Sequence, residues 1–144
     1  MNHKDQLDIL NNILSVDTAA KNKGLAKLGD EIINMVFSVA YTYYTNKPTG
    51  IKVSATVLST AMKEADLRQY AKNRAKSHDI ADSAEAIIAY SYLKQLCTIN
   101  EMINKVLDGL KKTDDSPTTV AKRRKISTNG ILNLLLYLKD LNKA

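Results

Sequence analysis

Cysteine, proline, glycine and tryptophan are scarce in this sequence of 144 residues, which holds one, two, five and none of them respectively. The single cysteine, Cys97, excludes an internal disulfide framework and a multi-cysteine zinc site. Its apolar surroundings favour a buried, inert thiol over a nucleophile. The two histidines, His3 and His78, do not have the spacing of a zinc-binding motif.

Long hydrophobic runs are also lacking. Residues 131–138 are strongly apolar, but this run is too short to cross a bilayer and is interrupted by Asn133. The N-terminal stretch, MNHKDQLDIL, carries acids and no uninterrupted apolar core, unlike a signal peptide. We therefore expect a cytoplasmic protein with no membrane partner.

Acidic residues are outnumbered by basic ones, 15 against 21, which gives a formal net charge of +6. This surplus favours an anionic partner such as a nucleic acid, although a basic protein with no such partner would have the same composition. The length fits one domain, residues 1–144, with a sizeable core.

Apolar residues recur at helical spacing almost throughout, and strand signals are nearly absent, so we predict an all-α fold. The clearest turn is 46–50, a basic connection covers 70–77, and the best candidate for a loop is 114–119. The last helix is rich in leucine, so it covers the core or lies in a subunit interface. The predicted helices cover residues 7–14, 25–45, 54–68, 78–93, 100–110 and 131–141.

Two of these helices carry acids among apolar side chains. In residues 78–93, HDIADSAEAIIAYSYL, Asp82 and Glu85 are three positions apart and share one helix face. The other sides are almost all apolar, as in a buried helix. In residues 25–44, LAKLGDEIINMVFSVAYTYY, Asp30 lies on the only polar strip. Packing these helices together would bring the three carboxylates close to one another.

Converging carboxylates raise one another's pKa, and a hard divalent cation such as Mg²⁺ or Mn²⁺ relieves the repulsion. A metal ion held in this way can activate water and stabilise a phosphodiester transition state. The alternative is that the acids pair with lysine or arginine at helix junctions. The residues alone leave both interpretations open.

The acidic stretches resemble motifs of the ribonuclease III family. LAKLGDEIIN is similar to the family signature, in which Leu-Glu-Phe-Leu-Gly-Asp leads into an apolar helix. IADSAEAIIAYSYL resembles its second acidic motif, Ala-Asp, two residues, then Glu-Ala-Leu-Ile-Gly-Ala, and KVSATVLSTAM resembles its middle helix. The order and separation of the three segments also agree, over residues 25–93.

The resemblance implies an all-α helical bundle that acts as a homodimeric endonuclease. Such an enzyme hydrolyses phosphodiester bonds in double-stranded or structured RNA with Mg²⁺ (or Mn²⁺), leaving 5′-phosphate ends. By matching position, Asp30, Asp82 and Glu85 would be catalytic metal ligands, three of the family's four metal-site acids. Gly29 would permit close packing of the two helices.

The chain departs from the signature at two positions. The fourth acid should stand four residues before Asp30, where the chain has Ala26, and the other glutamate of the signature is replaced by Lys23. Asp79, three residues before Asp82, is a possible substitute ligand. The departure leaves an alternative function, a catalytically impaired module that binds structured RNA without cutting it.

The residues after 93 are expected to form two helices with a basic loop, as in mini-ribonuclease III, in place of a double-stranded-RNA-binding domain. RNA would then be held by the catalytic domain and its dimer partner. Two basic clusters are predicted to track phosphates, with a solvated charged surface as the alternative for each. The first cluster comprises Lys72, Arg74 and Lys76, and the second comprises Lys122, Arg123, Arg124 and Lys125.

Overall fold

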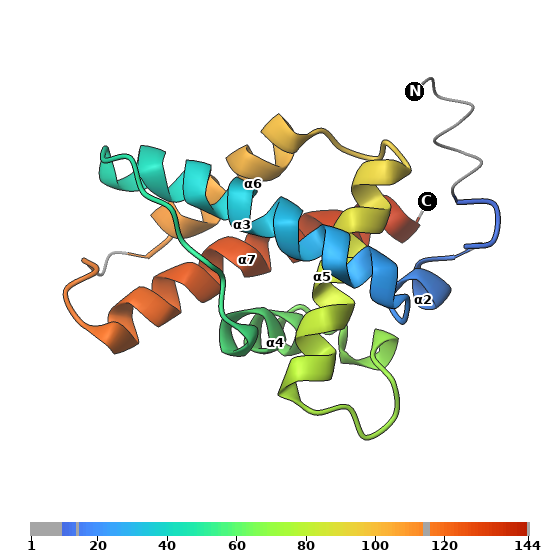
Figure 1. Ribbon diagram of the computed structural model, residues 1–144. Coiled ribbons are helices and arrows are strands. Elements are labelled where there is room, and N and C mark those ends of the chain that lie inside the picture. The colour runs from blue at the N-terminus through green and yellow to red at the C-terminus, as the bar shows by residue number, and fades with distance from the viewer. Residues whose placement is uncertain (1–9, 14, 114–115, 144) are drawn as a thin grey trace.

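The computed structural model describes residues 10–13, 15–113 and 116–143. Within these ranges all regular structure is helical, which confirms the all-α prediction (Figure 1). None of the described helices combines the length and hydrophobicity needed to span a membrane. The α-helices are α2 (Val16–Ala19), α3 (Lys23–Thr45), α4 (Ala55–Glu64), α5 (Ser77–Leu93), α6 (Ile99–Lys111) and α7 (Val120–Lys143), with the 3₁₀ turn η1 (Arg68–Tyr70) after α4.

The helix predicted over 54–68 ends earlier, at Glu64. Asp66 adopts a left-handed conformation with φ 59°, and the N–H of Leu67 returns to the carbonyl of Met62 at 2.9 Å. This is the Schellman arrangement that closes helix C-termini, formed here with aspartate in the place that glycine usually takes. The sequence signal was missed because no glycine marks the stop.

The last helix begins at Val120 and not at 131, so the second basic cluster lies on its first turns and not in a loop. The hydroxyl of Thr119 accepts the N–H of Lys122 at 3.1 Å and caps this helix start. The predicted helix at 7–14 lies largely outside the described residues, where 10–12 form a turn. Part of the predicted loop 114–119 also lies outside them.

Helix α5 forms the centre of the bundle. It packs against α3, α4, α7 and α2, and it is buried along most of its length. Figure 1 shows α5 crossing α3 near the middle of the molecule. The side chains of Leu134, Leu135 and Leu138 are fully buried, so this part of α7 covers the core of its own chain.

Gly29 sets how closely α3 and α5 approach each other. A Cβ at this position would lie 1.8 Å from the carbonyl oxygen of Glu85, a distance that no side chain can occupy. The two backbones therefore touch one residue away from Asp30.

Residues 49–53 run back along α3 and are attached to it by reciprocal hydrogen bonds. The hydroxyl of Thr42 bonds both the N–H and the carbonyl of Thr49 (3.0 and 3.3 Å), and that of Ser38 bonds both groups of Ile51 (2.8 and 3.1 Å). Four helical residues rise about 6 Å and two extended residues about 6.6 Å, so the spacings match. We call this polar pairing the α3 zipper.

Candidate functional site

The three predicted acids line one cavity of about 360 Å³ between α3 and α5. Asp30 comes from α3, one residue after the contact at Gly29, and Asp82 and Glu85 come from one face of α5. The opposite wall is formed by Lys52 and Val53, at the end of the segment paired with α3, and by the start of α4. The structure thus brings together acids that are more than fifty residues apart in the chain.

Glu85 is the most buried of the three acids, with 7% of its surface exposed. Burial, a hydrogen bond with the carboxylate of Asp30 and the negative charges of Asp30 and Asp82 raise its pKa to about 8. Two ionised carboxylates cannot hydrogen-bond to each other, because neither has a donor. Glu85 therefore keeps its proton at neutral pH and donates it towards Asp30.

Asp30 is held in its ionised form. The hydrogen bond from Glu85 and the ammonium group of Lys52 lower its pKa. The side-chain amide of Asn34 donates to Asp30 Oδ1 at 3.1 Å, and its carbonyl accepts the N–H of Val53 at 2.8 Å. Asn34 thus extends the α3 zipper to the site and fixes the orientation of the Asp30 carboxylate.

Cations face two of the acids. Lys52 Nζ lies 3.4 Å from Asp30 Oδ2, and Lys23 Nζ lies 3.3 Å from Asp82 Oδ2. The imidazole Nδ1 of His78 lies 3.6 Å from the same oxygen of Asp82. The alternative interpretation of the sequence, acids paired with lysine, is therefore observed in the same cavity. Both lysine side chains are largely exposed, so each ion pair is weak and easily exchanged.

The ribonuclease III family model matches residues 23–140. The chain belongs to the ribonuclease III family. A comparison with curated proteins gave no match. Ala26 and Lys23, the two positions at which the sequence is expected to depart from the ribonuclease III signature, both line the cavity, and the ammonium of Lys23 pairs with Asp82.

Asp79 lies beside the cavity between α3 and α5 and not in its wall. Its Oδ2 accepts the N–H of Lys76 at 3.1 Å, and its Oδ1 lies 3.6 Å from Lys72 Nζ. The N–H of Lys76 is the main reason why its pKa lies below the ordinary value. In this arrangement Asp79 caps the start of α5.

A divalent cation suits part of this donor set. Across the described residues, no group of three Asp, Glu, His or Cys side chains stands close enough to hold a metal ion. The pair formed by Asp30 and Glu85 does fit, because it offers hard oxygen donors and shares a proton that a cation would displace. Asp82 would join the pair only after leaving Lys23.

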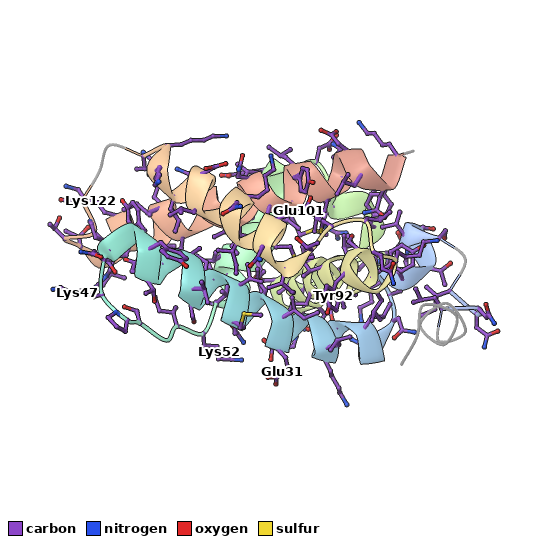
Figure 2. The ribbon with its side chains drawn as sticks, turned by 90° about the horizontal axis from the view of Figure 1, so that it is seen from above. Glu31, Lys47, Lys52, Tyr92, Glu101 and Lys122 are labelled. Atoms are coloured by element: carbon purple, nitrogen blue, oxygen red, sulfur yellow. The ribbon has the colours of Figure 1, made fainter. Side chains whose placement is uncertain are left out.

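The two basic clusters have different surroundings. In the first, Lys72 faces Asp79, and Arg74 has a left-handed backbone with φ 57°. In the second, Arg123 and Arg124 line a pocket next to Lys52. Lys52 itself projects away from the ribbon (Figure 2). The sequence did not indicate this lysine, because its position depends on the α3 zipper.

Proposed function

We propose that this ribonuclease III protein is a metal-dependent endoribonuclease, which hydrolyses phosphodiester bonds in double-stranded or structured RNA during RNA processing. The observation that carries the proposal is the cavity in which Glu85 is buried against Asp30 with Asp82 on its rim. A buried pair of acids costs stability, and such strongly shifted groups concentrate at functional sites.

The residues of the cavity would divide the work as follows. Asp30 and Glu85 would hold Mg²⁺ or Mn²⁺, with Asp82 as a third ligand. The bound ion would supply an activated water and offset the charge on the phosphate. Asn34 holds the Asp30 carboxylate in place, and the exposed ammonium of Lys52 is available to an RNA phosphate.

The assembly and location belong to the same proposal. We infer a single catalytic domain over residues 1–144 that acts as a cytoplasmic homodimer on RNA, without a membrane partner. The phosphate contacts would come from the basic side chains of Lys72, Arg74, Lys76, Lys122, Arg123, Arg124 and Lys125.

A second candidate function is binding of structured RNA without cleavage. The observation that favours it is the departure at Ala26 together with the ion pair between Lys23 and Asp82. These residues put two acids fewer and one cation more in the cavity than the signature does. A metal ion would then compete with Lys52 for Asp30 and with Lys23 for Asp82, and of the three acids only Glu85 has no lysine partner among the described residues.

The test incubates a labelled double-stranded RNA with the protein in Mg²⁺ and in Mn²⁺, beside Asp82→Asn and Glu85→Gln. Asp108→Asn is the matched control, since Asp108 is an exposed acid on α6 away from the cavity. We expect cleavage by the wild type and the control, and none by the two cavity variants, which should still bind RNA. Binding without cleavage in either metal would favour the second candidate. An absence of salt-sensitive RNA binding would exclude both.

A further inference from the structure

The cavity that Asp30, Asp82 and Glu85 line is called the carboxylate cavity below. A second pocket, of about 180 Å³, adjoins it and shares Lys52 and Val53 with it. It is lined by residues from the first turns of α7 and from the segment that leads into α4. We call it the arginine pocket, because Arg123 and Arg124 of α7 line it together with Lys52. The shared wall puts any occupant of one pocket next to any occupant of the other.

The lining of the arginine pocket selects for negative charge. It contains three cationic side chains, the hydroxyls of Ser54 and Ser127, an apolar floor that includes Phe37, and no acid. Among the described residues, none of the ion pairs involves Arg123 or Arg124. Unpaired guanidinium groups offer planar, charge-assisted hydrogen bonds that suit phosphate oxygens.

The start of α4 adds to this preference. Ser54 caps the helix, with its Oγ accepting the N–H of Val57 at 3.2 Å. The first backbone N–H groups of a helix point towards its N-terminus, which carries a partial positive charge. The arginine pocket therefore combines this helix end with three positively charged side chains.

The size of the pocket limits its occupant. Sites for small molecules measure about 300 to 1,000 Å³, so this volume suits part of a chain better than a whole free ligand. We propose that the arginine pocket binds a backbone phosphate of the RNA, close along the strand to the phosphodiester that enters the carboxylate cavity. This inference rests on the proposed function, and Lys52 would lie between the two phosphates.

The test measures binding of a duplex RNA in EDTA by fluorescence anisotropy, so that cleavage plays no part. Arg123→Gln/Arg124→Gln is compared with Lys122→Gln/Lys125→Gln, which removes the same charge from the same run but from residues outside the pocket. Lys63→Gln/Lys111→Gln controls for the net charge, because both lysines are exposed on other helices. All four proteins are measured over a range of salt concentrations.

We expect the arginine variant to bind RNA about ten- to a hundredfold more weakly, as for the loss of one or two charge-assisted hydrogen bonds. The slope of log affinity against log salt concentration should become shallower by about 1, as expected when one phosphate contact is lost. The Lys122→Gln/Lys125→Gln variant loses two screened contacts to phosphates, so it should bind about two- to threefold more weakly, whereas the Lys63→Gln/Lys111→Gln variant should bind as the wild type does. The arginines are exposed, so the fold should not change.

A neutral methylphosphonate placed at single positions of the RNA gives an independent readout. One position should weaken binding by the wild type but have no further effect on the arginine variant, because the two changes remove the same contact. Equal weakening by both α7 variants, or additive effects at every position, would overturn the arginine pocket and leave the nuclease proposal standing. A wild type that binds no RNA would overturn both.

Discussion

Replacing Glu85 with glutamine should make the stability of the protein less dependent on pH. Glutamine has nearly the shape of protonated glutamate and its amide can donate to Asp30, but it never ionises. In the wild type, folding raises the pKa of Glu85 from its ordinary value of 4.5 to about 8. The folded chain therefore holds this proton more tightly than the unfolded chain does.

The sign of the effect follows from linkage. The contribution of the protonated Glu85 is fully present below about pH 4.5 and is lost as the pH rises through about 8. At 1.36 kcal/mol for each pKa unit, the largest possible loss is about 5 kcal/mol. Water in the open cavity and the nearby ammonium of Lys52 reduce this cost, so we expect about 2 kcal/mol.

The assay is urea denaturation of the wild type and of Glu85→Gln at pH 5 and at pH 9 in EDTA. The free energies of unfolding should be similar at pH 5, and the variant should be about 2 kcal/mol more stable at pH 9. Asp108→Asn, at an exposed acid, should track the wild type at both values. A difference between wild type and Glu85→Gln that stays constant with pH would refute the assignment of a raised pKa to Glu85.

Three further changes test other parts of the site. Gly29→Ala should destabilise the protein by about 3 kcal/mol or more in urea denaturation, because the new Cβ meets the backbone of α5. Gly50→Ala is the control, because a Cβ at Gly50 meets open space and should have little effect. Equal effects of the two substitutions would contradict the close contact at Gly29. Asp79→Ala should lower the free energy of unfolding slightly, through the lost hydrogen bond to the N–H of Lys76, and leave Mn²⁺ uptake by calorimetry unchanged; lost uptake would instead make Asp79 a ligand. Lys23→Gln should remove the ion pair with Asp82 and strengthen Mn²⁺ binding about two- to fivefold, as measured by calorimetry. An unchanged affinity would show that Lys23 does not compete with the ion.

The helices and the meeting of the three acids could be expected from the sequence because both depend on local patterns. Helix α5 is apolar on nearly every side, so it had to lie inside the bundle, and the family resemblance implied that Gly29 permits close helix packing. Acids at fixed positions on two helices that must touch are then brought close together. The roles of Asp30, Asp82 and Glu85 as metal ligands remain a prediction.

The errors occurred where a tertiary contact or a local hydrogen bond decides the structure. Helix α7 starts at Val120, but its first apolar position facing the core is Ile126, so hydrophobic periodicity gave no sign of its first turns. The pairing of Lys23 with Asp82 joins residues 59 positions apart. Lys52 reaches Asp30 only because residues 49–53 fold back along α3, which no local pattern predicts.

The α3 zipper also limits which changes in chain length this protein tolerates. Its hydrogen bonds repeat every second residue from Thr49 to Val53, so a single-residue insertion just after Thr49 would put the wrong backbone groups opposite Ser38 and Asn34. The same slip would exchange the inner and outer sides of the segment and turn Lys52 away from Asp30. Residues inserted in the turn at 46–48 would only lengthen the turn, because they lie before the first paired residue. Natural variants of this chain should therefore differ in length in that turn and not within residues 49–53.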